Sequence, residues 1–376
     1  MPRPSRSPQG VAFVSGRASS LDDAIVAAAN LLGNSHAAVI AGLATDIAGA
    51  QAAIALAERI GAAIDHSSAD AMLRDLEVMR QAGWIITTPL QARARADVVF
   101  LVGPIADDLP SFAMPPRLQS GRDRRIIHLC PGHAGPCLRG AATVGDDPAQ
   151  LPVLLGVLRA LVAGHTVRPD APLLQPLREC ATHLLAAAFG VAAWSASSVH
   201  PLSIEMLCGL IGDLNQKTRF TGLPLPPADN AIGVLHAAAW ATGFPPRTGF
   251  ARSEPEHDPW RFDAARMVNG GEADAALWIS ALSPEIPRWR RQVPLVALVA
   301  PGAQFRVRPD VLIIVGRPGI DHPSVLFDAR IGALACSAPL PVREGLGEGR
   351  STEPRRAAAV ADVVHGIIAV LPSPPC

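Results

Sequence analysis

The sequence predicts an α/β protein with two doubly wound, Rossmann-like lobes. Short runs of aliphatic and β-branched residues recur along the chain, and the run at residues 96–103 is typical of a strand buried on both faces of a parallel sheet. Stretches with helical periodicity separate these runs, and glycine or proline closes several of them. Strands that alternate with helices in this way favour parallel sheets with helices on both faces.

The 376 residues are enough for two such lobes, each with its own core. A proline-rich stretch at residues 169–176 indicates a boundary. We therefore expect a first α/β lobe at residues 1–170 and a second α/β lobe at residues 171–342. Residues 343–376 are expected to form a polar, glycine-rich linker and a C-terminal helix that packs back on the first lobe.

The first lobe is expected to open with a β-α-β unit. Its parts are an apolar strand at residues 37–41, an alanine-rich helix at residues 46–59 and a strand at residues 62–64. A helix at residues 73–82, strands at residues 96–103 and 125–130 and an apolar helix at residues 148–163 complete the expected elements.

The second lobe is expected to hold four helices and five strands. Its clearest helix, at residues 201–215, carries Leu202, Met206, Leu210 and Leu214 on one stripe. The other helices are expected at residues 177–189, 229–240 and 262–269, and the strands at residues 191–195, 219–223, 273–279, 293–299 and 311–315. Residues 244–260 are dense in proline and charged side chains, and an irregular loop is expected there.

Composition narrows the classes of function. The formal net charge is zero, so nothing favours nucleic acid or an anionic membrane surface as a partner. Hydrophobic residues make up 49% of the chain, which indicates either a large core or broad apolar surface for permanent partners. Because the N-terminal residues lack a signal-peptide pattern and no apolar run is long enough to cross a membrane, we expect a cytoplasmic protein.

Common cofactor and metal motifs are missing from the sequence. It contains no dinucleotide-binding glycine pattern, phosphate-binding loop or hydrolase nucleophile elbow, and none of its six cysteines forms a Cys-x-x-Cys pair. His128, Cys130, His133 and Cys137 could together suggest zinc, but their spacing matches no standard finger or ribbon. The pattern favours a strand end followed by a Gly/Pro loop.

The loop at residues 61–74 follows the alanine-rich helix and a short strand, and contains Asp65-His66-Ser67. It resembles the loop that carries the metal-binding cysteine in the B subunit of formylmethanofuran dehydrogenase, a relative of the molybdopterin oxidoreductases. In that family a cysteine ligand and an active-site histidine follow the Asp-His pair. Their positions correspond here to Ala71 and Met72, and neither residue can supply a thiolate to a high-valent metal.

Four further segments carry the same resemblance. They are residues 95–103, residues 230–249 with an Asn-x-x-Gly helix start and Trp-Ala-Thr-Gly-Phe-Pro, residues 270–281, and Gly319-Ile-Asp321 followed by Phe327-Asp328. Together they extend over about residues 41–340. The resemblance implies two lobes like the central domains of molybdopterin oxidoreductases.

The departures from that family indicate a lost redox function. The dehydrogenase chain begins with cysteines that bind an iron–sulfur cluster, but this chain has no cysteine before Cys130, so neither the cluster nor its domain is expected. The chain therefore resembles the non-redox version of the B subunit, which occurs in the formyltransferase/hydrolase complex of methylotrophic bacteria. That resemblance implies a pseudoenzyme with no catalytic residue, cofactor or metal of its own.

The resemblance also implies partners and a pathway. It places the chain in a cytoplasmic hetero-oligomer of one-carbon metabolism that converts formyl-tetrahydromethanopterin to formate via methylofuran. The implied partners are an amidohydrolase-like zinc subunit, a formyltransferase subunit and a β-helical subunit, without nucleic acid or membrane.

Two groups of residues are the candidate site positions. Asp65, His66, Ala71 and Met72 are the expected vestigial active-site positions. His66 is either a leftover pocket residue or a loop histidine held by Asp65 or a backbone carbonyl. Arg247, Arg252, Glu254 and His257 are candidates for a partner or pocket loop, and the alternative is a solvated charged loop.

Two alternative functions stay open. One is a molybdopterin- or tungstopterin-dependent formylmethanofuran dehydrogenase subunit that retains redox activity, with the metal held by pterin sulfurs alone. The other is an unrelated doubly wound protein that binds a small molecule at the carboxyl ends of its strands, near Gly42 or Gly103.

Overall fold

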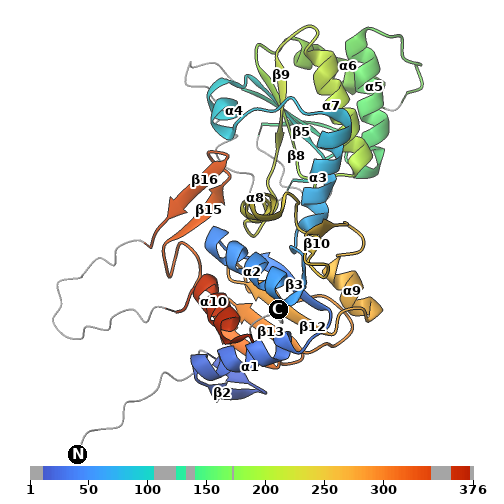
Figure 1. The fold of residues 1–376 in the computed structure, drawn as a ribbon. Helices are drawn as coiled ribbons and strands as arrows, with labels where there is room; N and C mark the ends of the chain where they lie inside the picture. The colour runs from blue at the N-terminus through green and yellow to red at the C-terminus, as the bar shows by residue number, and fades with distance from the viewer. Residues whose placement is uncertain (1–11, 106–123, 133–139, 172, 340–356, 373–376) are drawn as a thin grey trace, which may run out of the picture. The chain divides into compact units, whose positions relative to one another are not determined.

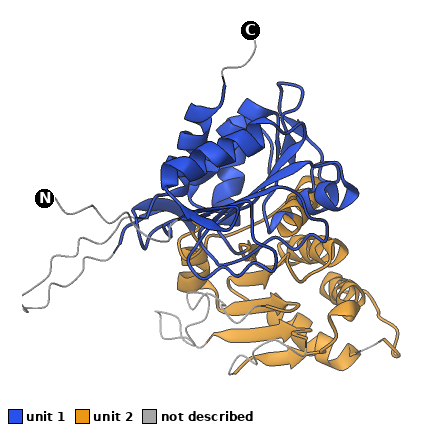
Figure 2. Ribbon diagram, turned by 90° about the horizontal axis from the view of Figure 1, so that it is seen from below, with its two compact units in different colours: residues 1–69, 228–327, 334–376 blue, residues 70–227, 328–333 orange. Residues whose placement is uncertain are grey.

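The computed structural model describes residues 12–105, 124–132, 140–171, 173–339 and 357–372, and it has a mixed α/β fold (Figure 1). The chain forms two compact units (Figure 2). Unit 1 comprises residues 1–69, 228–327 and 334–376, and unit 2 comprises residues 70–227 and 328–333. Within the described residues, no helix combines the length and the apolar character that crossing a membrane requires.

Unit 1 is built on a nine-stranded sheet. Its strand order is β11-β10-β4-β3-β12-β13-β14-β1-β2. The strands are β1 (Ala12–Val14), β2 (Arg17–Ser19), β3 (Ala38–Ala44), β4 (Ala63–Ile64), β10 (Thr248–Gly249), β11 (Glu256–His257), β12 (Ala275–Ser280), β13 (Leu295–Val299) and β14 (Val311–Ile314). The five central strands are parallel, and antiparallel pairs extend both edges.

Helices cover the sheet of unit 1 on both faces. They are α1 (Leu21–Gly33), α2 (Ile47–Ile60), α8 (Ala231–Thr242), α9 (Ala264–Gly270) and α10 (Val360–Val370). One core joins side chains of α1, α2, α8 and α10 to strand residues such as Ile40 and Leu277. A second core joins α9 to alternate strand residues such as Val39 and Trp278. The alternation is the two-residue period of a strand buried on both faces.

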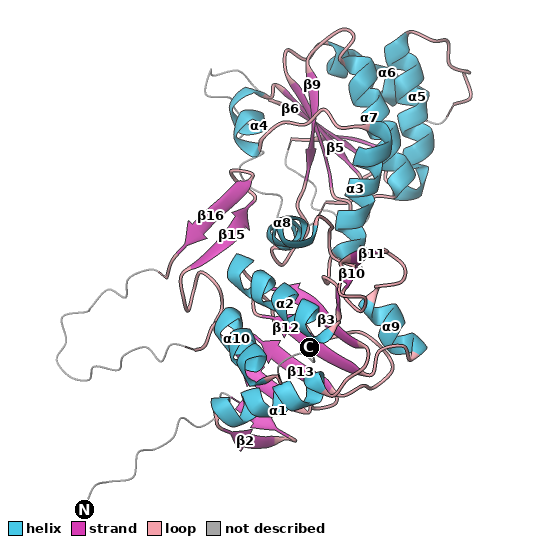
Figure 3. Ribbon diagram, viewed as in Figure 1, coloured by secondary structure: helices cyan, strands magenta, loops and turns pink. Residues whose placement is uncertain are grey.

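Unit 2 has a five-stranded, fully parallel sheet in the order β7-β6-β5-β8-β9. The strands are β5 (Val98–Val102), β6 (Arg125–Leu129), β7 (Ala142–Val144), β8 (Gly190–Trp194) and β9 (Phe220–Pro224). The helices are α3 (Ala69–Ala82), α4 (Pro89–Arg95), a 3-10 turn at Pro148–Gln150, α5 (Leu151–Ala163), α6 (Leu174–Leu185) and α7 (Pro201–Leu214). Figure 3 shows α5, α6 and α7 on one side of these strands and α4 on the other.

The strand orders identify both sheets as doubly wound. In each sheet the order reverses once, between β3 and β12 in unit 1 and between β5 and β8 in unit 2. A hairpin of β15 (Ser324–Asp328) and β16 (Ala333–Ser337) forms a separate two-stranded sheet. The predicted α/β class with parallel sheets is therefore confirmed.

The division of the chain differs from the expected lobes at residues 1–170 and 171–342. Strands β5 and β6 were expected in the first lobe, yet they share a sheet with β8 and β9 of the expected second lobe. Conversely, β12 pairs with β3 in the sheet of unit 1. The reason is physical: a strand's sequence shows that it is buried, but the choice of its neighbour depends on packing of segments far apart in the chain.

A C-terminal helix was expected, and a few other elements differ from the expectation in detail. Helix α10 packs against α1 and α2, which both lie in the segment that the sequence assigned to the first lobe. The expected linker at residues 343–356 lies outside the described residues. Sequence reasoning missed α1, α4, β7 and the two hairpins β1–β2 and β15–β16. The expected irregular loop at residues 244–260 contains the short strands β10 and β11.

Candidate functional site

Asp65 follows β4 at the carboxyl edge of the sheet in unit 1, where its carboxylate is buried. One carboxylate oxygen accepts a hydrogen bond from the backbone N–H of Ala264 (3.0 Å), and the other lies 3.4 Å from Nε of Arg247. Arg247 Nη2 also pairs with Asp263 at 2.7 Å. The structure thus joins the end of β4, the loop before β10 and the start of α9 through one buried ion-pair network.

Arg247 was a candidate for a partner or pocket loop, and its side chain points into unit 1. Only 11% of the side chain is exposed, and Nη1 donates to the carbonyl of Pro259 (3.0 Å). Its backbone N–H donates to the carbonyl of Ile64 (2.8 Å), and its φ of 68° lies in the left-handed region. Arg247 therefore holds the loop in place within unit 1.

Burial controls the protonation of Asp65. Desolvation raises the pKa of this carboxyl to about 7, and the Arg247 guanidinium and the Ala264 N–H oppose that rise. A carboxyl with a pKa near neutrality is a common feature of catalytic sites. Here, however, the two oxygens are occupied by structural partners within the fold, so the network accounts for Asp65 without a substrate.

His66 is the buried loop histidine that sequence reasoning gave as its alternative. Its Nδ1 accepts a hydrogen bond from the N–H of Ser68 (2.9 Å), and its Nε2 lies 3.1 Å from the carbonyl of Asp229. These partners define the neutral tautomer with the proton on Nε2. Burial lowers the pKa of His66 to about 4, which keeps the ring neutral near pH 7. The histidine is held by the carbonyl of Asp229 and not by Asp65.

Ala71 and Met72 both lie in the first turns of α3, in unit 2. Both side chains are buried, and Ala71 is part of the core that packs against β5 and α7. A methyl group supplies no metal ligand, and a thioether is a soft donor that does not replace an anionic thiolate on a high-valent metal. The residues at these positions do not fit a molybdenum or tungsten site that needs a cysteine ligand.

The other loop candidates lie at or near the surface of unit 1. Arg252 and Glu254 are exposed, and Arg252 lies in a long ion pair of 3.9 Å with Glu256. His257 is half-buried: its Nδ1 lies 2.9 Å from the carbonyl of Arg247, and its ring stacks on Phe244 at 5.9 Å. The structure therefore brings Asp65, Arg247 and His257 together and leaves Arg252 and Glu254 at the surface.

Asn230 has a role that sequence reasoning missed. Its side-chain amide donates to the carbonyl of Thr45 (2.7 Å), just after β3, and accepts a hydrogen bond from the N–H of Phe327 (2.8 Å) in β15. A Cβ on Gly233 would lie 2.3 Å from Oδ1 of Asn230, so only glycine leaves room for this amide. The Asn-x-x-Gly pattern was visible in the sequence, and its structural meaning is this bridge.

The possible zinc ligands are only partly within the described residues. His128 Nε2 lies 2.9 Å from the carbonyl of Gly103, and burial raises the pKa of the Cys130 thiol to about 11. His133 and Cys137 lie outside the described residues. Among the residues that the structure does describe, no three His, Cys, Asp or Glu side chains cluster closely enough to hold a metal ion.

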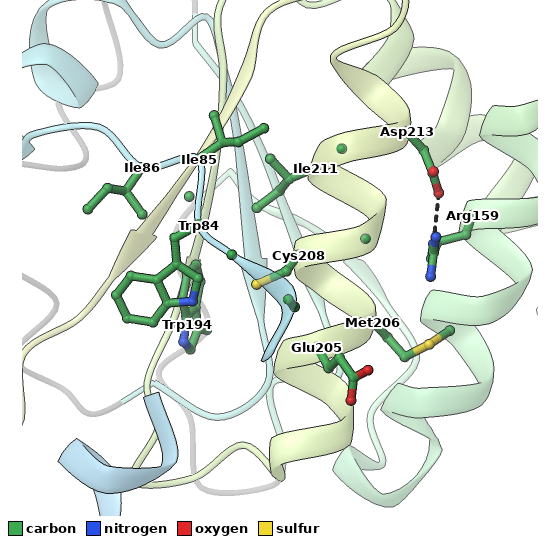
Figure 4. Close-up of a pocket in the computed structure, with 15 residues that line it drawn as sticks. Trp84, Ile85, Ile86, Arg159, Trp194, Glu205, Met206, Cys208, Ile211 and Asp213 are labelled. Carbon is green, nitrogen blue, oxygen red and sulfur yellow. Dashed lines mark hydrogen bonds and ion pairs between the residues drawn. The ribbon is translucent and has the colours of Figure 1, made fainter. Parts of the chain in front are cut away.

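A pocket of about 530 Å³ opens in unit 2 (Figure 4). Trp84 and Trp194, packed edge to face at 5.7 Å, form one wall, and α7 forms the opposite wall. The ion pair between Arg159 and Asp213 (2.7 Å) lines another side. Burial raises the pKa of the Cys208 thiol to about 11, so this wall offers no activated nucleophile.

Comparison with known proteins identifies two similar B subunits. No family model matches the chain. A curated protein, the B subunit of the formyltransferase/hydrolase complex Fhc of Methylorubrum extorquens, is 37% identical to it over 331 residues, which are 86% of this chain and 90% of the relative. The B subunit of the tungsten-containing formylmethanofuran dehydrogenase 2 of Methanocaldococcus jannaschii is 24% identical over 61% of this chain and 56% of its own length.

A solved structure has the same fold. It is a chain in the X-ray crystal structure of the formyltransferase/hydrolase complex FhcABCD from Methylorubrum extorquens in complex with methylofuran. The two chains superpose with a TM-score of 0.81 and 34% sequence identity, over 95% of this chain and 97% of the other. The similarity therefore extends over both units.

Proposed function

Because the chain belongs to the family of formyltransferase/hydrolase complex B subunits, we propose that it is the structural, non-catalytic B subunit of such a complex. In this proposal the complex converts formyl-tetrahydromethanopterin to formate via methylofuran. The chain would assemble with an amidohydrolase-like zinc subunit, a formyltransferase subunit and a β-helical subunit. Its two doubly wound units would derive from the central domains of a molybdopterin oxidoreductase. The cytoplasmic location expected from the sequence stays a prediction.

One observation carries the non-catalytic part of the proposal. The expected active-site positions carry either side chains whose polar atoms are bonded within the fold or side chains that cannot act as an anionic metal ligand. Asp65 and His66 have all their polar atoms engaged by Arg247, Ala264, Ser68 and Asp229. Ala71 and Met72 provide no anionic ligand.

The test is co-expression of the tagged chain with the other subunits from the same source. We expect stoichiometric co-purification, formyltransferase and hydrolase activities in the assembled complex, and no stoichiometric molybdenum or tungsten by elemental analysis. A chain that purifies as a monodisperse monomer and retains no other subunit would refute the proposal.

A matched pair of variants separates a structural role from catalysis. His66→Asn removes the imidazole that a catalytic role would require, and Arg168→Ala changes an exposed loop residue. In complexes matched for subunit content, we expect both variants to keep the wild-type turnover. A large fall in turnover for His66→Asn alone, with the complex intact, would assign chemistry to this chain.

The redox alternative has less support than the structural role. The B subunit of the tungsten-containing dehydrogenase is similar to this chain, but its sequence identity is lower than that of the formyltransferase/hydrolase B subunit, and the similarity covers a smaller share of both chains. A metal held by pterin sulfurs alone would still appear in elemental analysis. About one molybdenum or tungsten per chain, with oxidation of a formyl carrier by an artificial electron acceptor, would favour this alternative.

A further inference from the structure

Unit 1 contains a groove of about 1010 Å³ that plays no part in the vestigial site. Its walls are residues 286–295, which lead into β13, and residues 305–308 and 310, which lead into β14. Since β13 and β14 are parallel neighbours, these segments lie side by side at the amino edge of the sheet. Asp65 and His66 follow a strand of the same parallel set and so lie at its opposite, carboxyl edge.

The groove is strongly basic. Its lining contains five exposed arginines, which are Arg288, Arg290, Arg291, Arg306 and Arg308. Its one carboxylate, on Asp310, accepts a hydrogen bond from the N–H of Leu295 (2.8 Å) and so has a structural use. Because the whole chain has no net charge, this basic lining is a local feature of the surface.

Four of these arginines have no acidic partner in the part of the chain that the structure describes. Arg288 pairs with Glu285 at 2.9 Å. For the side chains of Arg290, Arg291, Arg306 and Arg308, no hydrogen bond or ion pair with a described residue is formed. Their guanidinium groups are therefore available to carboxylates from outside the described fold.

The wall at residues 286–295, which carries three of the arginines, is held in place by contacts with β12 and α9. Trp289 packs edge to face on Trp278 with ring centroids 5.6 Å apart, and Asn269 Oδ1 accepts the backbone N–H groups of Arg290 (2.7 Å) and Arg291 (3.3 Å). A fixed backbone lowers the entropy that ordering this wall would cost on binding.

We propose that this groove docks an acidic polypeptide segment from another subunit of the complex. The inference rests on the proposed function, which supplies the partner subunits. Arginine favours carboxylates because its planar guanidinium forms two parallel hydrogen bonds with them. Nucleic acid is the other polyanion that a basic groove with aromatic side chains can bind, and the second test below distinguishes it from an acidic peptide.

The first test uses the co-expressed complex with this chain tagged. Arg290→Glu/Arg306→Glu reverses one charge on each wall, and Arg168→Glu/Arg178→Glu makes the same change at two exposed arginines of unit 2. We expect the groove variant to bind at least one partner tenfold more weakly and to release it at lower salt, while the control binds like wild type. Equal retention of all subunits by both variants overturns the inference.

Folding and assembly are checked separately. Arg290→Gln/Arg306→Gln removes the charges without adding repulsion, and we expect an intermediate loss of binding with an unchanged thermal unfolding midpoint. If the unmodified chain fails to assemble at all, the proposed function is refuted; if it assembles and the groove variants do too, only the groove inference falls.

The second test identifies the occupant. A benzophenone amino acid replaces Gln292, an exposed residue of the groove lining, in the intact complex. We expect crosslinks to a partner peptide rich in Asp and Glu. Crosslinks to another copy of this chain or to a segment without acidic residues would contradict the proposal, as would tighter competition by single-stranded oligonucleotide than by an acidic peptide.

Discussion

At the scale of single residues, the loop around Asp65 illustrates how a pattern typical of catalysis can serve the fold. A buried carboxyl and a buried histidine with shifted pKa values are typical of active sites. The same shifts arise whenever titratable groups are buried and satisfied by internal partners. Here both carboxylate oxygens of Asp65 and both ring nitrogens of His66 have partners within the fold.

Removing Arg247 should therefore be costly. Arg247→Met leaves Asp65 and Asp263 without their shared cation in a region where the side chains of Arg247 and Asp65 are only 11% and 10% exposed. We expect the free energy of unfolding to fall by about 3–5 kcal/mol, because a buried charge loses its partner. Urea unfolding at pH 8 measures this, where more of Asp65 is ionised than at pH 6.

An exposed ion pair provides the control for that variant. Arg330 pairs with Asp328 at 2.6 Å, but 77% of its side chain is exposed. Arg330→Met is expected to cost less than about 1 kcal/mol. Equal effects of the two substitutions would contradict a buried, structural network around Arg247.

The neutral state of His66 predicts a dependence of stability on pH. The unfolded chain takes up a proton on this histidine below pH 6.5, whereas the folded chain does so only near pH 4. Stability contributed by His66 is therefore complete above pH 6.5 and is lost as the pH falls toward 4. The loss is roughly 3 kcal/mol at most.

Comparison with His66→Asn isolates this contribution, because Asp65 and Asp75 shift stability in the opposite direction over part of the same pH range. Burial raises the pKa of Asp75 to about 6 and that of Asp65 to about 7, so both favour the folded state as the pH falls. We expect the stability difference between wild type and variant to be larger at pH 7 than at pH 4.5. A difference that does not change with pH would show that His66 is not held neutral.

At the scale of elements, replacing either of two helix glycines by alanine is expected to change stability in opposite directions. Gly233 in α8 and Gly212 in α7 both lie inside helices. A Cβ at residue 233 would meet Asn230 Oδ1 at 2.3 Å and displace the amide that bridges Thr45 and Phe327, whereas a Cβ at residue 212 would meet nothing within 4 Å.

We therefore expect Gly233→Ala to destabilise the protein by about 1–3 kcal/mol, because it breaks the partly buried hydrogen bonds that Asn230 makes with Thr45 and Phe327. Gly212→Ala should stabilise it by up to about 1 kcal/mol through helix propensity. Thermal unfolding of both variants measures the signs. Stabilisation by Gly233→Ala would mean that the Asn230 bridge is unimportant.

The elements that the sequence predicted well are those whose start and end are both marked by nearby residues, such as a capping side chain and a terminal glycine. The helix expected at residues 46–59 is α2, because Asp46 caps it by accepting the N–H of Gly49 (2.9 Å) and Gly61 ends it with a φ of 68°. The hairpin β1–β2 was missed because its strands have only three residues each. Such short strands depend on pairing, here of β1 with β14, and carry little local pattern.

The candidate site was only partly predictable for the same reason. The absence of a thiolate at residues 71 and 72 follows from the sequence alone. The pairing of Asp65 with Arg247, residues 182 apart in the chain, follows only from the sheet that brings β4 beside β10. The sequence therefore offered Arg247 either as part of a partner or pocket loop or as part of a solvated charged loop, and it did not show that the guanidinium lies inside unit 1.

At the scale of the whole molecule, each unit has cores of its own. The apolar clusters of unit 1 draw on both ends of the chain and on the stretch after residue 228. Those of unit 2 draw only on residues between 71 and 225. Unit 2 is therefore nearly continuous in sequence, while unit 1 is assembled from segments on both sides of it.

This arrangement predicts which fragments fold. Residues 70–227 contain every strand of the five-stranded sheet and both of its cores, so this fragment should be a folded domain when expressed alone. A fragment of residues 1–170 ends at the boundary expected from the sequence. It lacks α7 and the strands β8 and β9, and neither sheet is complete in it. We expect cooperative thermal unfolding, followed by circular dichroism, for the first fragment and none for the second. The reverse result would mean that the proline-rich stretch at residues 169–176 is the true domain boundary. Strand pairing between distant segments would then contribute less to stability than interactions within residues 1–170.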